Sequence, residues 1–482
     1  VGKVEITGDT ISVPRQELLD KLNIRKKDYY DREAIAKDLE YLTRMVQNDG
    51  YAYAEINPKT VTKDAEQKVD ITYDIKKGSL VYFNRINVTG NTKTRDKVIR
   101  RQLDFTEGDL YNSDKLKSSY AKLNRLRYFE EVHFQTAKGP EENLTDINIG
   151  VKERPTGMFS IGAGYSGQDG AMVMAQIAQQ NLFGRGQSLT LQGALGTESS
   201  SIDLSFTEPY LFDLPLWMKA DIWKMTREYD SYNLDSTGFG ITFGYPIWEK
   251  IIGYVGYKLA SNDVTDVLPT ASQTIKDQEG TTTQSGILTS LGRDTTDDSI
   301  FPTTGSRNRL AADFYGGPFG GDVSLAKYNT SSTFFFKVPP FNEDLVFSPR
   351  VRLGYIQPFE GKEIPVYERY VLGGINSIRG LKDVGPRDPV TGDVLGGTTM
   401  LLFNFELVFP LVKNAGMKGV VFFDTGNAWE YKYDLGDMRK TCGAGIRWYS
   451  PVGPLRLEWG YVLDRKEEEP AYRWDFTIGW FM

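Results

Sequence analysis

The sequence of 482 residues contains one cysteine, Cys442, and one histidine, His133. This scarcity excludes disulfide frameworks, thiolate zinc sites and histidine-based catalytic triads, because each needs more such side chains than the chain holds. His133 lies in the alternating stretch Glu130–Phe134, where we expect a half-exposed structural role. We therefore expect no enzymatic activity, no metal and no cofactor.

Long hydrophobic runs and a basic charge balance are also missing. No stretch approaches eighteen consecutive apolar residues and the mean hydropathy is −0.40, which excludes a transmembrane helix. The formal net charge of −7 gives no basic field, so nucleic acid is not expected as a partner. No signal peptide is present and Val1 already belongs to an alternating segment, which predicts a mature or trimmed chain.

The N-terminal third contains an internal repeat. The strand pattern of Lys3–Thr10 recurs at Arg85–Thr92 with the same Gly and Asx turn ending. Apolar residues at helical spacing follow in both copies, at Ile35, Leu39, Leu42 and Val46 and at Leu116, Tyr120, Leu123 and Leu126. Each copy closes with two predicted strands, at Tyr51–Ile56 and Val69–Ile75 in the first and at Tyr128–Phe134 and Asp146–Val151 in the second. The pattern predicts two α+β domains of order β-α-α-β-β, at residues 1–79 and 80–154.

Each repeat is small and must leave at least one sheet edge open. An open edge can template an added strand, which favours peptide binding by these domains. A pair of inert spacer domains explains the composition equally well, and the residues alone leave both interpretations open.

After Pro155 the helical periodicity ends and short segments alternate apolar and polar residues between clusters of Gly, Pro, Asn and Asp. This pattern is typical of a transmembrane β-barrel and predicts one over residues 155–482. The sixteen predicted strands are Gly157–Ser166, Ala171–Asn181, Ser188–Gly196, Ile202–Phe206, Leu216–Arg227, Gly238–Ile247, Ile251–Ala260, Ile287–Arg293, Arg307–Tyr315, Ser324–Phe336, Leu345–Gln357, Met400–Phe409, Lys418–Asn427, Gly443–Tyr449, Leu455–Leu463 and Tyr472–Met482.

The connections support the barrel. Those after even strands are short, as at residues 184–186 and 450–453, whereas those after odd strands include residues 262–286 and a longer stretch at about 358–398. This asymmetry is that of an outer-membrane barrel and puts the repeats on the short-turn, periplasmic side. A soluble β-sandwich is the rival, because alternation cannot distinguish lipid from a partner sheet. Aromatic residues near strand ends favour the barrel; they are Tyr210, Trp217, Trp248, Trp429, Trp448 and Trp480.

The long connection contains the motif Ile378-Arg379-Gly380-Leu381. Together with Gly419–Trp429, Asn181–Gly186 and the closing Phe476–Gly479, it resembles the outer-membrane assembly and secretion barrels with N-terminal POTRA domains. The resemblance spans the whole chain. It implies that Arg379 folds back into the barrel and pairs with acidic residues of the wall, which here are Glu406 and Asp424.

The chemistry of these residues agrees with that implication. Glu406 shares the polar parity of Asn404, and an aspartate at position 424 facing lipid would cost on the order of a few kcal/mol, so both should point inward. A guanidinium between two carboxylates could hold a mobile loop in one place. The alternative is that all three groups are separately hydrated in a wet lumen.

The resemblance implies assembly and insertion of β-barrel proteins into the bacterial outer membrane. Capture of unfolded β-barrel clients by the periplasmic POTRA domains would precede lateral opening between the first and last strands, and periplasmic lipoprotein subunits and outer-membrane lipid are the other implied partners. Glycine weakens a strand, and the predicted seam contains several glycines, although relief of crowding at the barrel wall explains them equally well. Its residues are Gly157, Phe159, Ile161, Gly162 and Gly164 on the first strand and Phe476, Ile478, Gly479 and Trp480 on the last.

Two alternatives stay open. A two-partner secretion transporter of the same superfamily exports one unfolded exoprotein and also uses two POTRA domains, whereas a passive porin needs neither the repeats nor the arginine loop. The chain also departs from the family. Its last residue is Met482 rather than an aromatic, which leaves the terminal register open. Assembly members usually carry five POTRA domains, which implies either an N-terminal truncation or a naturally two-domain relative.

Overall fold

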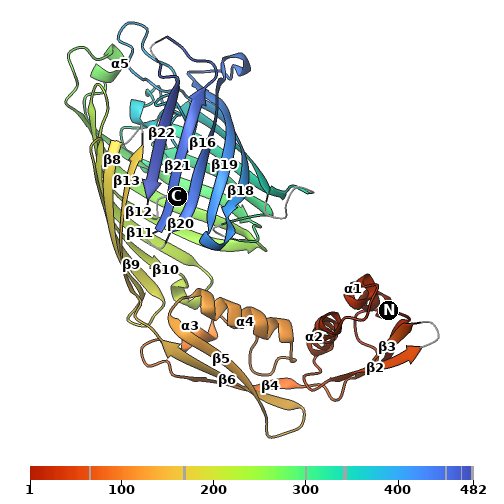
Figure 1. Cartoon of the computed structure of the whole chain (residues 1–482). Helices are drawn as coiled ribbons and strands as arrows, with labels where there is room; N and C mark the ends of the chain where they lie inside the picture. The colour runs from red at the N-terminus through yellow and green to blue at the C-terminus, as the bar shows by residue number, and fades with distance from the viewer. Residues whose placement is uncertain are drawn as a thin grey trace. The chain divides into compact units, whose positions relative to one another are not determined.

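The computed structural model describes residues 1–63, 67–166, 170–298, 301–339, 345–450, 453–467 and 469–478. The chain divides into two compact units (Figure 1). The first comprises Val1–Thr156 together with Gln180–Gly186, and the second comprises Gly157–Gln179 and Gln187–Met482. Each unit is described by itself below.

The first repeat forms a three-stranded sheet covered by helices. Its elements are β1 (Val4–Gly8), α1 (Arg15–Lys21), η1 (Ile24–Lys26), α2 (Arg32–Asn48), β2 (Glu55–Lys63) and β3 (Lys68–Lys76). The strand order is β1-β3-β2, with β1 parallel and β2 antiparallel to β3. Helix α2 begins where the Asp31 side chain accepts the backbone N–H of Glu33, and it buries the predicted stripe of Ile35, Leu42 and Val46.

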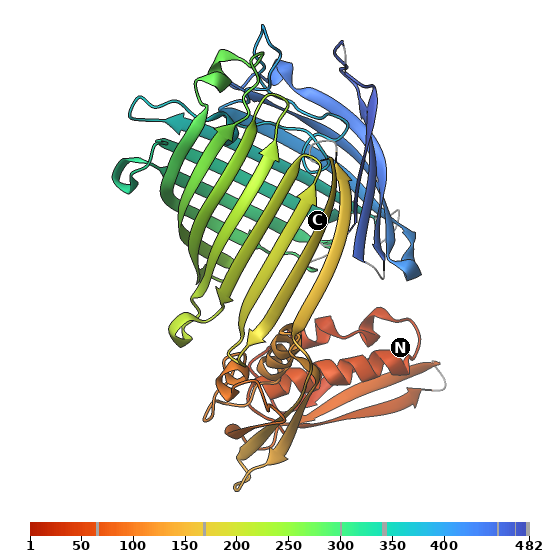
Figure 2. The same ribbon diagram turned by 90° about the vertical axis from the view of Figure 1, so that its left-hand side faces the viewer.

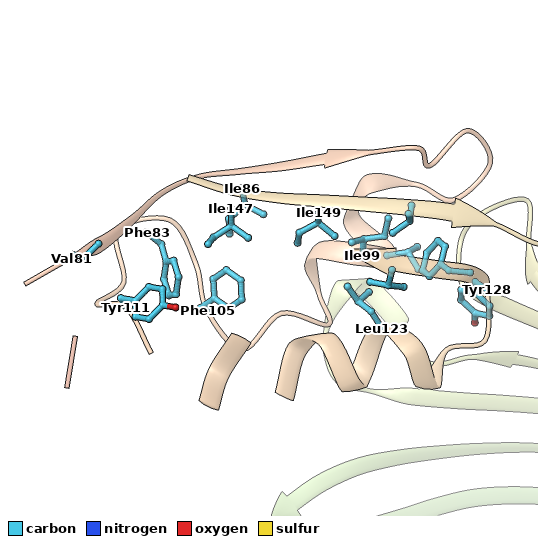
Figure 3. Close-up of a cluster of buried hydrophobic side chains, with 14 residues drawn as sticks. Val81, Phe83, Ile86, Ile99, Phe105, Tyr111, Leu123, Tyr128, Ile147 and Ile149 are labelled. Atoms are coloured by element: carbon cyan, nitrogen blue, oxygen red, sulfur yellow. The ribbon is translucent and has the colours of Figure 1, made fainter. Parts of the chain in front are cut away.

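The second repeat has the same order. Its elements are β4 (Tyr82–Thr89), α3 (Asp96–Arg100), α4 (Ser113–Arg125), β5 (Phe129–Lys138) and β6 (Leu144–Glu153), in a sheet β4-β6-β5. Figure 3 shows the core between sheet and helices, where the rings of Phe83 and Phe105 lie tilted with centroids 4.4 Å apart and Tyr128 lies at the other end of the cluster. The predicted β-α-α-β-β order is therefore confirmed. The predicted strand Tyr51–Ile56 is displaced, because Tyr51–Ala54 form a turn and β2 starts at Glu55.

The C-terminal end of β6 fixes the loop that precedes α3. The Glu153 carboxylate accepts hydrogen bonds from the Thr92 hydroxyl at 2.8 Å and from the backbone N–H groups of Lys93 and Thr94 at 2.8 and 2.6 Å. Burial raises the pKa of Glu153, but these donors outweigh it and lower the pKa to about 2. The loop at residues 92–94 is thus held by one ionised side chain.

The second unit is a closed barrel of sixteen antiparallel strands (Figure 2), as predicted. The strands are β7 (Gly157–Ser166), β8 (Gly170–Leu182), β9 (Gln187–Gly196), β10 (Ser199–Glu208), β11 (Trp217–Glu228), β12 (Asn233–Trp248), β13 (Ile251–Thr265), β14 (Gly280–Asp294), β15 (Gly305–Tyr315), β16 (Leu325–Lys337), β17 (Val346–Pro358), β18 (Thr399–Val412), β19 (Met417–Trp429), β20 (Arg439–Ser450), β21 (Gly453–Val462) and β22 (Tyr472–Ile478). Closure excludes the rival β-sandwich.

The outer face of the barrel is apolar. Phe159, Ile161, Val173 and Ile177 are all more than half exposed and share one parity along β7 and β8. A row of exposed apolar side chains on a closed barrel fits a wall that faces lipid. Among the described residues, no helix has the length and apolarity needed to cross a membrane.

Strands β12 to β14 extend farther than predicted. The segment 262–286 was expected to be a loop, but β13 continues to Thr265 and β14 starts at Gly280, which leaves only residues 266–279 and the short helix α5 (Gln273–Lys276). The extension is polar: Ser236 donates to Asn262 at 2.7 Å, which donates to Gln284 at 3.4 Å. The alternation of apolar and polar residues cannot reveal these parts of the strands, because their inward side chains are polar and hydrogen-bond to one another.

We predict that Glu153→Gln loosens the second repeat at neutral pH. The folded pKa lies below the unfolded value of about 4.3, so the stabilisation is present above about pH 4.3 and is lost as the pH falls toward 2. Hydrogen exchange of residues 91–95 in the full chain should be faster in the variant at pH 7 and equal to wild type near pH 2. Glu142→Gln, at an exposed glutamate before β6, is the control. A variant indistinguishable from wild type at pH 7 would contradict the prediction.

Candidate functional site

Residues 359–398, between β17 and β18, form a long loop that folds into an apolar cluster against the inner wall. The loop contributes Leu372, Ile378, Leu381 and Val384, and the wall contributes Met400 and Leu402 of β18, Ala428 of β19 and Val462 of β21. Ile378 is fully buried. Bridges between Tyr370 and Gly397 and between Leu372 and Val384 close the loop on itself. The loop is therefore a packed element with its own core.

Arg379 points from this cluster into the wall and is only 2% exposed. Its guanidinium donates to Asp424 through Nε at 2.7 Å and Nη2 at 2.6 Å, and its backbone N–H reaches the same carboxylate at 3.1 Å. Nη1 donates to Glu406 at 2.7 Å. The structure thus brings together Arg379 and both acidic residues that the sequence proposed. The paired donors of the guanidinium match the two oxygens of Asp424, a geometry that lysine could not reproduce.

The rest of the motif fits the same contact. The Arg379 guanidinium lies over the Phe422 ring, 3.5 Å from its centroid, which adds a cation–π contact to the ion pairs. Gly380 adopts a φ of +93°, and a side chain there would lie 2.9 Å from the backbone of Gly460 on β21. Both glycines are required, since any Cβ would separate the loop from the wall.

The structure adds three charged residues that sequence reasoning missed. Glu458 of β21 accepts from Arg379 Nη1 at 3.0 Å, while Arg447 of β20 bridges Glu406 and Glu458. Arg456 donates to Glu458 at 2.6 Å and to the loop carbonyl of Ile375 at 2.9 Å. Three arginines therefore meet three acids, which is how buried charges are tolerated. The alternation in Leu455-Arg456-Leu457-Glu458-Trp459 was the available signal, because it puts both charges on the inward parity.

The loop has two further attachments of different chemistry. Glu368, in the short helix η5 (Val366–Glu368), accepts from Lys327 of β16 at 2.9 Å and from Gln284 of β14 at 2.8 Å. Asp393 accepts from the Ser231 hydroxyl and from the backbone N–H of Ser272 at 2.6 Å. Acidic side chains of β18, β19 and β21 thus hold the loop through Arg379, and Lys327 of β16 holds it through Glu368. Asp393 adds a third contact, to the neighbouring loops.

The structure describes part of the seam between β7 and β22. Within the described residues, which end at Ile478, only Phe476, Thr477 and Ile478 pair with Tyr165, Gly164 and Ala163. Strand β7 pairs ten residues with β8 on its other side. The pairing of Gly157, Phe159, Ile161 and Gly162 across the seam falls outside the described residues, as do the predicted seam residues Gly479 and Trp480.

Known proteins share this architecture. The model of the Omp85 superfamily domain matches residues 181–482. The chain belongs to the Omp85 superfamily. The POTRA model, described as the surface antigen variable number repeat, matches residues 1–78 and 81–154. The predicted fold class, two POTRA domains before a sixteen-stranded barrel, is therefore confirmed.

Related Omp85 proteins cover the whole chain. The "Outer membrane protein assembly factor BamA" of Nitratidesulfovibrio vulgaris is 34% identical over 100% of this chain and 62% of that protein's length. The crystal structure of Haemophilus ducreyi BamA lacking POTRA domains 1-3 is 23% identical with a TM-score of 0.74, covering 99% of both chains. CdiB from Acinetobacter baumannii is 14% identical with a TM-score of 0.58, covering 99% of this chain and 89% of that one.

These findings fix the location of an Omp85 chain of this kind. The barrel lies in the bacterial outer membrane and the POTRA domains lie in the periplasm, as predicted. The chain spans about 62% of the length of the first curated relatives it matches.

We predict that Asp424→Ala and Arg379→Ala release the loop while the barrel stays folded. Removing one partner of a buried ion pair costs about 3–5 kcal/mol, because the other charge is left unpaired. Proteinase K should then cleave within residues 376–388 of the membrane-embedded variants and spare the wild type. Arg387→Ala, an exposed arginine of the same loop, is the matched control. Unchanged protection of both variants would refute the tether.

A second prediction concerns the attachment of the loop through Glu368. Glu368→Gln removes the ion pair with Lys327 but keeps the side-chain size, so hydrogen exchange of residues 363–372 should rise about tenfold, as the loss of a hydrogen bond to a charged group implies. Glu363→Gln makes the same change at an exposed position of the same loop and should have no effect. Equal exchange in the two variants would show that Glu368 does not anchor the loop.

Proposed function

We propose that this Omp85 chain assembles and inserts β-barrel proteins into the outer membrane, and that clients enter at the seam between β7 and β22. The observation that carries the proposal is the 34% identity over the whole chain to a protein named an outer membrane protein assembly factor. A second relative of that name is 27% identical over 99% of this chain.

The physical reason is the behaviour of strand edges in lipid. Hydrocarbon cannot satisfy unpaired backbone N–H and C=O groups, whereas an incoming strand can. Strand β7 is thus the proposed template on which a client's terminal strand would pair by β-augmentation once β7 separates from β22. Phe159 and Ile161 project outward on β7 and would meet lipid beside the client, while Gly162 and Gly164 keep the inner side free of bulk.

The POTRA domains would receive the client before insertion. Each sheet has two edge strands, β1 and β2 in the first and β4 and β5 in the second, of which β2 and β5 are the longer. Strand β2 carries Pro58, which has no N–H to offer an added strand. Strand β5 has no proline over Phe129–Lys138, so we assign client capture to β5 in preference. Periplasmic lipoprotein subunits would dock on the remaining POTRA surface.

The ion cluster around Arg379 would set the geometry of the seam. Glu458 lies on β21, the strand that pairs with β22, so the loop is tied to the neighbour of a seam strand. No chemical step is assigned to these charges, and the proposed activity is non-enzymatic. Two-partner secretion is the rival function. Its support is weaker, since the similarity to CdiB, at 14% identity, concerns the fold alone.

A disulfide across the seam tests the gate. Gly164 and Thr477 are paired in register, and a Cβ at Gly164 meets its neighbours no closer than 3.7 Å, so Gly164→Cys with Thr477→Cys in a Cys442→Ser background should form the bond. We expect the oxidised protein, reconstituted in liposomes, to lose client insertion by at least about tenfold and to regain it on reduction, because β7 can no longer offer its edge.

Asn308→Cys with Ser332→Cys locks β15 to β16 in the same background and controls for the presence of a cross-link. Undiminished insertion by the seam-locked protein would overturn the gate. Loss of insertion in both locked proteins would also count against it, since the effect would then not belong to the seam.

A further inference from the structure

One surface of the first unit is basic although the chain as a whole is acidic. The segment Lys93–Arg101 carries five cations and one acid, in the sequence Lys-Thr-Arg-Asp-Lys-Val-Ile-Arg-Arg, and the turn Gln180–Gly186 adds Arg185. Lys93, Arg95 and Arg185 are exposed. Within the described residues, the side chains of these three make no hydrogen bond or ion pair to the protein, so their charges are available to a ligand.

The turn is fixed against this segment. Asn181 donates to the Thr94 hydroxyl at 2.8 Å and accepts the backbone N–H of Gly186 at 2.8 Å, and the N–H of Arg95 donates to the carbonyl of Gly184 at 2.9 Å. A side chain on Gly184 would lie 1.9 Å from the Lys93 carbonyl, so this approach requires glycine. Phe183 and Arg185 are therefore held beside Lys93 and Arg95.

Phe183 is unusual in two respects. It is 78% exposed, and its φ of +51°, where the left-handed region begins, is rare for an aromatic residue. Comparable aromatics are Phe212 in the turn after β10, at 81% exposure, and Trp248 at the end of β12, at 75% exposure. Exposed aromatics on successive turns of one side are typical of a membrane interface.

The position of the turn in the chain gives its surroundings. Strand β8 crosses the membrane and ends at Leu182, so Phe183 and Arg185 lie at the boundary of the periplasmic leaflet. A phenylalanine at the acyl boundary and arginine or lysine beside it form the usual combination for binding an anionic lipid surface. The basic residues of the segment 93–101 are held to this turn by the bonds described above.

We propose that Phe183, Lys93, Arg95 and Arg185 form a site for anionic phospholipid headgroups of the periplasmic leaflet. Phe183 inserts at the level of the acyl chains, and the three cations contact headgroup phosphates. Glu153 supports the site indirectly, because it holds the backbone of Lys93 and Thr94 in place. This surface would attach the second POTRA domain to the membrane independently of client binding.

Hydrogen exchange of the full chain in lipid nanodiscs tests the site. Exchange of residues 91–101 should be about fivefold slower in discs containing phosphatidylglycerol than in discs of phosphatidylcholine alone, and high salt should remove the difference. The variant Lys93→Gln, Arg95→Gln, Arg185→Gln should show no lipid dependence. Lys26→Gln, Arg32→Gln, Arg85→Gln removes the same charge from exposed positions elsewhere in the unit and should behave as wild type.

Phe183→Asn, which tolerates the same backbone conformation, should weaken the lipid effect, while Phe212→Asn should leave it intact. Equal exchange in the two kinds of disc would overturn the proposal. So would the same protection from inorganic phosphate added to phosphatidylcholine discs, because the site would then bind a free anion without a membrane.

Discussion

A guanidinium that is removed from water must be matched by carboxylates, and the loop of this Omp85 chain is organised by that requirement. Arg379 reaches Asp424 through three donors and shares Glu406 and Glu458 with two arginines of the wall. Such a cluster contributes little net stability by itself, since desolvation offsets attraction. The cluster instead selects one position of the loop, because only that position satisfies every charge. The apolar packing of Ile378 and its neighbours then fills that position.

The loop connects several strands of the barrel from inside. Most neighbouring strands share long ladders, and the loop ties β18, β19 and β21 together from inside through Arg379. Strand β21 also pairs with β22, so the acidic partner Glu458 lies one strand from the proposed seam. Opening at the seam would expose backbone groups that lipid cannot satisfy, so the proposed function requires a client strand to take their place.

The sequence predicted the barrel well because each strand alternates between lipid and lumen, and that alternation survives in the residues themselves. Arg379, Glu406 and Asp424 were identified through the resemblance of the motif Ile378–Leu381 to the family, and the inward parity of the two acids agreed with it. The sequence missed Glu458, Arg447 and Arg456, which needed knowledge of which strands become neighbours. The polar ends of β13 and β14 were read as loop, because hydrogen-bonded Asn262 and Gln284 carry no hydrophobic signal. The strand placed at Tyr51–Ile56 failed for a related reason, as aromatic residues suit both turns and strands.

The contact between Gly380 and Gly460 couples the position of the loop to that of β21. Neither glycine has a side chain that could adjust its position, so a small displacement of β21 would move the backbone of the loop directly. Strand β21 also pairs with β22, so this backbone contact joins the loop to the strand beside the final one. A movement of the final strand would therefore reach the loop inside the barrel through β21 alone.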